Sequence, residues 1–551
     1  MASQQSLLDK PRKSVSKTIW LILSVAVLSS SALIASYFIK PTSFFNLSSS
    51  YHVCRHALDT ASCMAHVSEV AQAPVLTTTK DNEFNLLRSF LMKSTSHIER
   101  AMNTANTIKN RINSPRAEAA LRDCVELMDM SMERIWDSMV ALTKQTIESQ
   151  EDAHTWLSTV LTNHETCLDG LEGPARSLME AELQDLISRA GTSLALFVAA
   201  LPPKVDNIIG ENLNMDFPSW VTSKDRKLLE STAKDIKPNV VVATDGTGNY
   251  MTVAEAVESV PNKSNKRYII YIKNGTYNEH VEISSQKKNV MLVGDGMNET
   301  IISGSLNRAD GTGTFQTATV AAVGDGFIAQ DIQFRNTAGS IKEQAVALRV
   351  GADQAIINRC KIAACQDTLY AHSNRQFYRD SFISGTVDFI FGNAAVVLQK
   401  CKLVARKPLS YQNNMVTAQG RTNPNQNTGT SIQQCNIIPA TDLKPVMKSI
   451  KTYLGRPWQK YSRTVVMQSL LSNHIDPKGW SEWDDQHKDY LETLYYGEYS
   501  NRGPGAGLGG RVNWTGFHIL TTADAMKFTV KQFIQGDVWL ANKGVNYIES
   551  L

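Results

Sequence analysis

The spacing of apolar residues divides the chain into a helical part and a β-rich part. Between about residues 51 and 200 apolar side chains recur every three or four positions, as in Leu121, Val125, Met128, Met132 and Ile135. This is the period of an amphipathic helix. The pattern predicts four helices, over 82–112, 116–149, 153–169 and 175–199. We therefore expect an all-α domain over residues 51–200, built as an antiparallel four-helix bundle.

After about residue 240 short β-rich runs separated by turn residues replace the helical period. Five of them, QDIQF, NRCKI, RDSFI, QKCKL and QQCNI, share the order polar, polar, small or apolar, variable, apolar. Their central residues are Ile332, Cys360, Ser381, Cys401 and Cys435, which lie 28, 21, 20 and 34 positions apart. Repeats of this length indicate a solenoid, in which each coil buries its apolar face against its neighbours. A parallel β-helix fits best, and a β-sandwich with coincidental spacing is the alternative.

The N-terminal segment predicts entry into the secretory pathway. Residues 1–18 form a basic flank with Lys10, Arg12, Lys13 and Lys17, and residues 19–39 are uncharged and long enough to cross a bilayer. We expect a signal anchor or a cleaved signal peptide that inserts the precursor in the membrane; the alternative is a buried core helix. Sequons for glycosylation agree with this route, and they occur at Asn46, Asn262, Asn274, Asn298 and Asn513.

Residues 201–229 read as a linker, because Pro, Asn and Gly are frequent in them. The linker ends in a basic cluster, SKDRKLL, that contains Arg226, Lys227, Leu228 and Leu229. A dibasic pair in a secreted linker predicts a protease site, although an ordinary solvated turn would look the same. Processing here would release residues 230–551 as a separate domain.

Net charge differs between the two parts of the chain. Residues 1–229 have 22 Lys and Arg against 25 Asp and Glu, a net charge of −3, and residues 230–551 have 34 against 28, a net charge of +6. A mildly basic domain suits an acidic polymer as substrate. It would equally suit nucleic acid, so charge alone does not decide the partner.

Eight cysteines in a translocated chain can form disulfides. We expect Cys54 with Cys63 to close an N-terminal hairpin and Cys124 with Cys167 to join two helices of the bundle. Cys401 and Cys435 are expected to pair, because they occupy equivalent positions on successive coils, while Cys360 and Cys365 should be free or weakly paired. No C-x-x-C pair occurs, which disfavours a zinc ribbon or a redox motif.

Polar residues at the length of one coil suggest a site on the solenoid. Gln344, Gln366 and Asp388 are 22 positions apart, and Asp367 adjoins the second. Side chains separated by one coil stack on one face. Two carboxylates and two amides would then meet in one patch, although internal polar ladders or turns would have the same spacing.

The sequence motifs around these residues resemble those of plant-type pectin methylesterases. They are GTYNE at Gly275, GTFQTATV at Gly313, QAVAL at Gln344, the run from QDTLY at Gln366 to FGNA at Ala394, TAQGR at Thr417 and LGRPW at Leu454. The helical part, with its two cysteine pairs, resembles the inhibitor domain that precedes longer members as a pro-region. The resemblance implies a right-handed parallel β-helix, methyl-esterified pectin as substrate, cell-wall secretion, and no metal, cofactor or nucleic acid. It also implies an inhibitor as a partner, either a separate protein or the chain's own pro-region.

Residue roles follow from the same resemblance. Asp388 is expected to be the nucleophile, Asp367 the general acid and then base, and Arg456 the cation that orients the nucleophile. Gln366 and Gln344 would donate to the oxyanion. Contacts with the sugar are expected from Trp458, Tyr370, Phe391 and Thr314. Two departures from the family pattern, Cys365 and Ser381, stand at the wall of this site or on the next coil.

Other functions fit the sequence less well. A calcium-dependent lyase would need clustered acidic ligands, whereas the Asp484–Asp485 pair lies in a Trp-containing segment typical of surface charge. No G-x-S-x-G word occurs, which disfavours an α/β-hydrolase esterase. A non-catalytic wall-binding module would not need Gln366, Asp367, Asp388 and Arg456 together.

Overall fold

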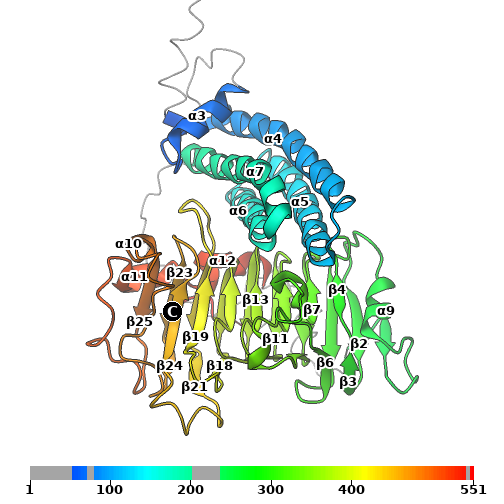
Figure 1. The fold of residues 1–551 in the computed structure, drawn as a ribbon, viewed down its shortest axis with the longest axis vertical. Helices are drawn as coiled ribbons and strands as arrows, with labels where there is room; N and C mark the ends of the chain where they lie inside the picture. Colours follow the sequence, from blue (N-terminus) through cyan, green and yellow to red (C-terminus); the bar gives the residue numbers. More distant parts are fainter. Residues whose placement is uncertain (1–51, 71–79, 202–235, 541–546) are drawn as a thin grey trace, which may run out of the picture.

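The computed structural model describes residues 52–70, 80–201, 236–540 and 547–551 (Figure 1). The predicted membrane segment 19–39, the sequon at Asn46 and the predicted processing residues Arg226, Lys227, Leu228 and Leu229 lie outside these ranges. None of the helices in the described ranges combines the length and the apolar character that a membrane span requires.

The N-terminal part is helical, as predicted. After the short α3 (Thr60–Ser68) come four long helices, which are α4 (Lys80–Lys109), α5 (Pro115–Ala141), α6 (Ile147–Gly170) and α7 (Gly173–Ala200). Ser114 caps α5 by accepting from the Ala117 N–H, and a capping box between Thr146 and Ser149 starts α6. The predicted helix 116–149 is therefore wrong at its C-terminal end, because the capping box breaks the chain into two helices there.

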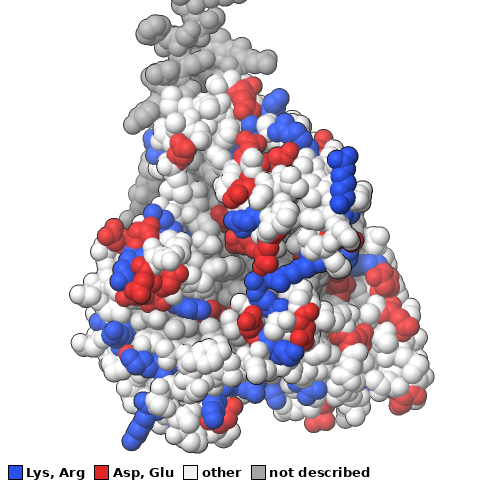
Figure 2. Space-filling model, viewed as in Figure 1, with Lys and Arg blue, Asp and Glu red and all other residues white. Residues whose placement is uncertain are grey.

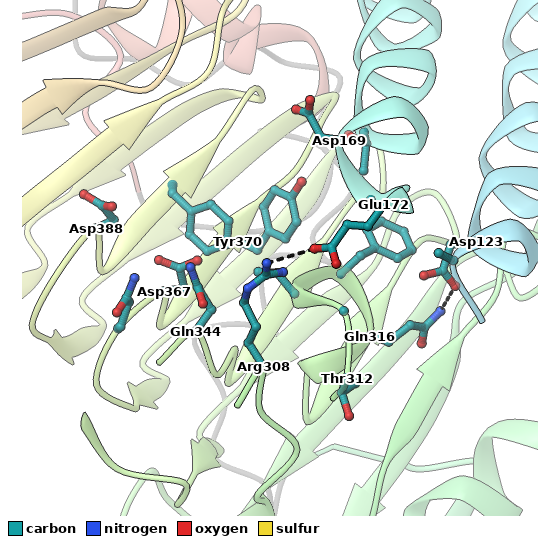
Figure 3. Close-up of a pocket in the computed structure, with 18 of the residues that line it drawn as sticks. Asp123, Asp169, Glu172, Arg308, Thr312, Gln316, Gln344, Asp367, Tyr370 and Asp388 are labelled. Carbon is teal, nitrogen blue, oxygen red and sulfur yellow. Dashed lines mark hydrogen bonds and ion pairs between the residues drawn. The ribbon is translucent and has the colours of Figure 1, made fainter. Parts of the chain in front are cut away.

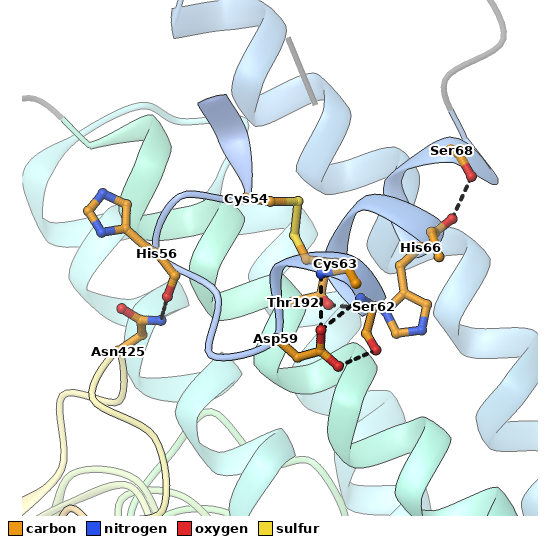
Figure 4. Close-up of a disulfide and its surroundings, with 11 residues drawn as sticks. Cys54, His56, Asp59, Ser62, Cys63, His66, Ser68, Thr192 and Asn425 are labelled. Atoms are coloured by element: carbon orange, nitrogen blue, oxygen red, sulfur yellow. Dashed lines mark hydrogen bonds between the residues drawn. A yellow bond between two sulfur atoms is a disulfide. The ribbon is translucent and has the colours of Figure 1, made fainter. Parts of the chain in front are cut away.

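Two disulfides hold this helical domain together. Cys54 and Cys63, which precede α4 in the sequence, form one disulfide (Figure 4). Cys124 of α5 and Cys167 of α6 form the other. Both were predicted from the sequence. Beside the first bond, Asp59 begins α3 by accepting hydrogen bonds from the N–H groups of Ala61 and Ser62, at 3.0 and 3.1 Å.

Within residues 236–540 all strand pairs are parallel, and the strands form three sheets. The eleven-stranded sheet has the order β1 (Val240–Val242), β2 (Tyr268–Ile272), β5 (Val290–Gly294), β8 (Ile328–Gln330), β11 (Ala355–Asn358), β14 (Arg375–Arg379), β17 (Ala395–Gln399), β20 (Gly429–Gln433), β23 (Arg463–Met467), β25 (Tyr495–Tyr499) and β26 (Phe517–Ile519). The eight-stranded sheet has the order β24 (Leu470–Leu471), β21 (Asn436–Pro439), β18 (Lys402–Ala405), β15 (Phe382–Gly385), β12 (Lys361–Ala363), β9 (Gln333–Asn336), β6 (Thr300–Gly304) and β3 (Gly275–Asn278).

The seven-stranded sheet completes each coil and carries the residues of the site described below. Its order is β22 (Thr452–Pro457), β19 (Asn414–Gln419), β16 (Ile390–Gly392), β13 (Leu369–Ala371), β10 (Leu348–Val350), β7 (Val320–Ala322) and β4 (Val281–Ile283). Short helical segments lie between or after the strands, namely α9 (Val253–Glu258), η2 (Thr314–Thr317), η3 (Ser340–Lys342), α10 (Tyr490–Thr493), α11 (Thr522–Met526), α12 (Val530–Ile534) and α13 (Gly536–Trp539). From β2 to β25, strands that follow each other in the chain join different sheets, so the fold is the predicted parallel β-helix.

The sequence repeat is the turn between the eleven-stranded and the eight-stranded sheet. In each of the five repeats the second residue has a positive φ, between 47° and 57°, and these residues are Asp331, Arg359, Asp380, Lys400 and Gln434. A residue in the left-handed backbone conformation turns the chain sharply, and the side chain of the next residue then points into the core. This explains why the third position of each word is apolar or small, as in the fully buried Ile332 and Cys360.

The predicted Cys401–Cys435 disulfide is wrong, because both thiols are free. The two residues do follow this turn on successive coils, and the Cys401 N–H donates to Cys435 Sγ at 3.3 Å. Each thiol instead donates to a main-chain carbonyl of the preceding coil, Cys401 to Tyr378 at 3.6 Å and Cys435 to Leu398 at 3.3 Å. Cys360 and Cys365 are also free and buried, as expected.

The helical domain packs on the outer face of the seven-stranded sheet (Figure 1). Arg375 of β14 donates to Asp152 of α6 at 2.7 Å, and Arg134 of α5 donates to Asp325 at 3.0 Å. The buried Asn393 side chain donates to Thr162 of α6 at 2.8 Å. The helices therefore cover the sheet whose loops and strands carry the predicted catalytic residues.

Candidate active site

One row of side chains runs across the outer face of the seven-stranded sheet. Strand pairing puts the following residues in register from β4 to β22: Glu282, Ala321, Arg349, Tyr370, Phe391, Ala418 and Arg456. Three of the predicted site residues, Tyr370, Phe391 and Arg456, thus share one row although they are up to 86 positions apart in the sequence. The Tyr370 and Phe391 rings are stacked with their centroids 4.2 Å apart.

Asp367 and Asp388 occupy equivalent places just before β13 and β16. Both have a positive φ, 61° and 51°, a conformation that Asp tolerates better than most residues. The register pairs Leu369 with Ile390, an offset of 21, so Asp388 stacks on Asp367. The prediction that Asp388 follows Gln366 by one coil of 22 is wrong by one residue, while Gln344 does pair with Gln366. Each aspartate lies two residues before its strand, so the 21-residue offset between β13 and β16 stacks Asp388 on Asp367.

Arg456 forms a bidentate ion pair with Asp388. Its Nε and Nη2 donate to Oδ1 and Oδ2 of Asp388 at 2.9 and 2.6 Å. The guanidinium also lies under the ring of Trp483, with Cζ 4.2 Å from the ring centroid. Asp388 is 5% exposed. A bidentate pair of this kind fixes the orientation of the carboxylate.

Asp367, unlike Asp388, forms no ion pair with an arginine in the described part of the chain. Burial, followed by the charge of the neighbouring Asp388, raises the pKa of Asp367 well above its usual range, although Arg456 and Arg308 act in the other direction. Two carboxyl groups close together do not both ionise readily, and the one without an arginine partner keeps its proton. The site therefore combines an arginine-paired carboxyl group with a second carboxyl group whose pKa is raised.

Both aspartates open into a cavity of about 650 Å³. Every predicted site residue lines it, namely Asp367, Asp388, Gln366, Arg456, Gln344, Thr314, Trp458, Tyr370 and Phe391. The amide oxygen of Gln344 is buried without a hydrogen-bond partner. The Trp458 ring lies edge-on to Phe391 at 6.0 Å between centroids, which extends the aromatic surface on one side of the aspartates.

The other wall of the cavity belongs to the helical domain. Asp123 of α5, Asp169 of α6 and Glu172 face the β-helix there (Figure 3). Thr166 of α6 also lines the cavity. The Gln316 side chain donates to Asp123, and Arg308 donates to Glu172 at 2.9 Å. Figure 2 shows Lys and Arg side chains gathered along the boundary between the two domains on the face in view. The site is thus closed on one side by the chain's own N-terminal domain.

Sequence reasoning missed several residues of this site. Trp483 stands in the segment that was read as surface charge, yet its ring covers Arg456. Arg308, Phe315 and Gln316 line the cavity from the loop before β7. Phe315 and Gln316 lie in GTFQTATV, so that word contained a signal. Arg308 lies outside every recognised motif.

Other predicted positions are not part of the site. Asn262, Asn274, Asn298 and Asn513 are exposed, as glycosylation acceptors must be. Cys365 precedes Gln366 and is buried, and Ser381 lies in the turn of the same coil as β14 and β15. In the described ranges no three His, Cys, Asp or Glu side chains are grouped as metal ligands would be.

Comparisons with known proteins agree with this geometry. Residues 239–537 match the Pectinesterase family, and residues 48–196 match the Plant invertase/pectin methylesterase inhibitor family. A Pectinesterase/pectinesterase inhibitor of Ficus pumila var. awkeotsang is 53% identical over 100% of this chain and 99% of its own length. Pectinesterase 2.1 of Solanum lycopersicum is 55% identical over 91% of this chain and 90% of its own.

Among solved structures, the pectin methylesterase from carrot is 57% identical and has a TM-score of 0.56. It covers 57% of this chain and is itself covered to 99%, which corresponds in length to the β-helical domain alone. The family match extends over more than half of the chain, and relatives of about 50% identity align over nearly all of it. The chain therefore belongs to the pectinesterase family of carboxylic ester hydrolases, with an inhibitor-type helical domain in front of the enzyme domain.

Proposed function

We propose that the β-helical domain hydrolyses the C6 methyl esters of homogalacturonan to pectate and methanol through an acyl-enzyme on Asp388. The observation that carries this proposal is the pair of unlike carboxyl groups in one cavity. Asp388 is paired with Arg456 through two hydrogen bonds, and burial next to it raises the pKa of Asp367. Ester cleavage needs a nucleophile and a proton donor at the same place, and these two groups can supply them.

Acylation uses the two aspartates in different roles. An Asp388 oxygen attacks the C6 carbonyl carbon, and the carbonyl oxygen becomes an oxyanion that the side-chain amides of Gln366 and Gln344 stabilise. When the tetrahedral intermediate collapses, the bond from C6 to the methoxy oxygen breaks. Asp367 gives its proton to that oxygen, so methanol leaves and an anhydride with Asp388 remains.

Deacylation returns both aspartates to their starting states. Asp367, now a carboxylate, takes a proton from a water molecule whose oxygen attacks C6 of the anhydride. The bond between C6 and Asp388 then breaks, which restores the Asp388 carboxylate and gives the galacturonic acid product. That acid loses its proton to solvent. Tyr370, Phe391 and Trp458 offer the sugar chain apolar faces, and Thr314 a polar contact, beside the reacting ester.

We also infer that the helical domain inhibits its own enzyme domain before processing. Residues of α5, α6 and the segment before α7 line the same cavity as the aspartates, so a polysaccharide chain and the helices compete for one space. Cleavage after Arg226, Lys227, Leu228 and Leu229 would separate the domains. The membrane segment 19–39 would deliver the precursor to the secretory pathway, and residues 230–551 would act in the cell wall.

Methanol release tests this function directly. Highly esterified pectin is incubated with residues 230–551, and the assay is repeated after residues 51–200 have been added back. We expect methanol from the first reaction and less from the second. Ultraviolet-absorbing unsaturated ends would instead identify a lyase, and pectin binding without either product would identify a wall-binding module.

A further inference from the structure

Arg308 projects into the cavity from a loop that is fixed to the catalytic coils. Its backbone N–H donates to the Gln344 carbonyl at 3.0 Å, and its own carbonyl accepts from Gly311 at 2.9 Å. The Asn307 side chain accepts from the Asp310 N–H at 2.9 Å and donates to the Asp310 carboxylate at 2.8 Å. These bonds hold the arginine beside Gln344, on the wall of the cavity (Figure 3).

The charge of Arg308 is available to a ligand in the groove. It is close enough to Asp367 to be one of the two arginines that lower the pKa of that carboxyl group. It does not belong to the Arg456–Asp388 pair, and its side chain is 36% exposed. In the described part of the chain its only salt-bridge partner is Glu172. Once the helical domain is removed, Arg308 faces the cavity and has lost Glu172, its salt-bridge partner.

Glu172 is placed as a ligand of this arginine. It is the residue that precedes α7, where a short polar side chain would normally cap the helix, yet its carboxylate makes no capping bond. Its Oε1 instead accepts from Arg308 Nη2 at 2.9 Å and from Arg116 Nη2 at 3.2 Å. A carboxylate carried by the helical domain therefore enters the enzyme's groove and binds an arginine near the reacting centre.

We propose that Arg308 is a binding site for the ionised carboxylate of a galacturonate unit that has already lost its methyl ester, and that Glu172 occupies this site in the full chain. The inference rests on the proposed function, because only a demethylated unit carries such a charge. Asp388 and Asp367 act on an esterified, neutral unit. Arginine binds carboxylates with directed, charge-assisted hydrogen bonds, so Arg308 favours chains that are partly demethylated next to the ester being cleaved.

The test compares two substrates on the released β-helical domain, residues 230–551, a unit that the carrot structure shows can fold alone. Methanol release is measured on fully methyl-esterified oligogalacturonates and on the same oligomers with about half of the esters removed. Because Arg308 also acts on Asp367, kcat can change on both, and the readout is the ratio of the two KM values. Arg308→Gln should raise KM about tenfold on the half-esterified substrate only, and Arg308→Lys should raise it less.

Lys402→Gln is the matched control, because it removes one exposed positive charge on β18, outside the cavity. It should leave the ratio unchanged. An Arg308→Gln domain with the same KM ratio as the wild type would overturn the proposal. A wild-type domain that released no methanol from either substrate would instead overturn the proposed function.

The place of Glu172 is tested with unesterified trigalacturonate as the probe. A specific protease sequence is inserted between residues 201 and 235 of the full chain, and the chain is cut after purification. Trigalacturonate should weaken the association of the two parts in the wild type and have little effect in Arg308→Gln. If trigalacturonate inhibits the free domain but does not disturb the association, Glu172 and the sugar carboxylate do not share a site.

Discussion

Raising the pH from about 5 to about 8 should weaken the contact between the helical domain and the β-helix. Burial in the docked state raises the pKa of four carboxyl groups on α5 and α6: Asp123 to about 6, Glu126 to about 7, Glu165 to about 8 and Asp169 to about 6. Groups of the β-helix lie against them, including Gln316 at Asp123 and Thr422 at Glu165. If the domains are to stay docked as the pH rises through these values, each carboxyl group must ionise while it is buried.

The sign follows from proton linkage. A carboxyl group whose pKa is higher in the docked state binds more protons there, so its contribution is complete below its free pKa and is lost as the pH rises through the docked value. For Glu126 the free value is 4.5 and the docked value about 7. The difference of about 2.5 units gives an upper limit of about 3 kcal/mol, or roughly three-hundredfold in the dissociation constant, reached if docking causes the whole burial.

The assay uses the chain with a protease site between residues 201 and 235, cut after purification. Association of the two parts is followed by size-exclusion chromatography at several pH values between about 5 and about 8. Glu126→Gln fixes this position in a neutral form, so the pH dependence should become shallower and the contact should persist to higher pH. Glu99→Gln changes an exposed residue of α4 and is the control. Association that is independent of pH, or that strengthens as the pH rises, would refute the reasoning.

Three substitutions in the enzyme domain should impair methanol release or pectin binding in different ways. Asp388→Asn should lower methanol release at least about a thousandfold while pectin binding and thermal melting are retained; near-normal release by the folded variant would contradict the acyl-enzyme. Asp367→Asn should lose about a hundredfold to ten-thousandfold on methyl esters but less on activated aryl esters, whose leaving groups need no proton; an equal loss on both would argue against a proton donor. Gly420→Ala places a methyl group 2.7 Å from the Trp458 ring, so it should raise KM for pectin about threefold or more and change tryptophan fluorescence; an unchanged KM and spectrum would show that the ring does not contact the sugar.

Much of the fold could be predicted because local chemistry sets it. The 3.6-residue period gives the four long helices, and only the capping box at Thr146 was overlooked. The five repeat words gave the solenoid because each contains the same left-handed turn residue before an inward-pointing side chain. That Cys401 and Cys435 remain unpaired could not be predicted, since equivalent positions on adjacent coils do not determine whether two thiols face each other or main-chain carbonyls.

The candidate site was predictable only where it is contiguous in the sequence. Gln366, Asp367 and Asp388 lie in two recognisable words, but the one-residue difference in coil length that puts Asp388 on Asp367 required the strand register. Trp483 and Arg308 reach the cavity from loops with no motif of their own. Their roles depend on which side chains lie across the groove, and those partners are more than 25 residues away in the sequence.

The face that is suited to sugar is also the face that the helices bury. Ala321, Tyr370, Phe391 and Ala418, from the row across the seven-stranded sheet, belong to the same apolar cluster as the inner residues of the helical domain. At the edge of this cluster Arg308 is paired with a carboxylate from the helices. A demethylated pectin chain presents the same combination of an apolar ring face and a carboxylate. Under the proposed inhibition, two ligands of matching chemistry compete for this one surface, so removal of the helical domain would give the substrate access to it.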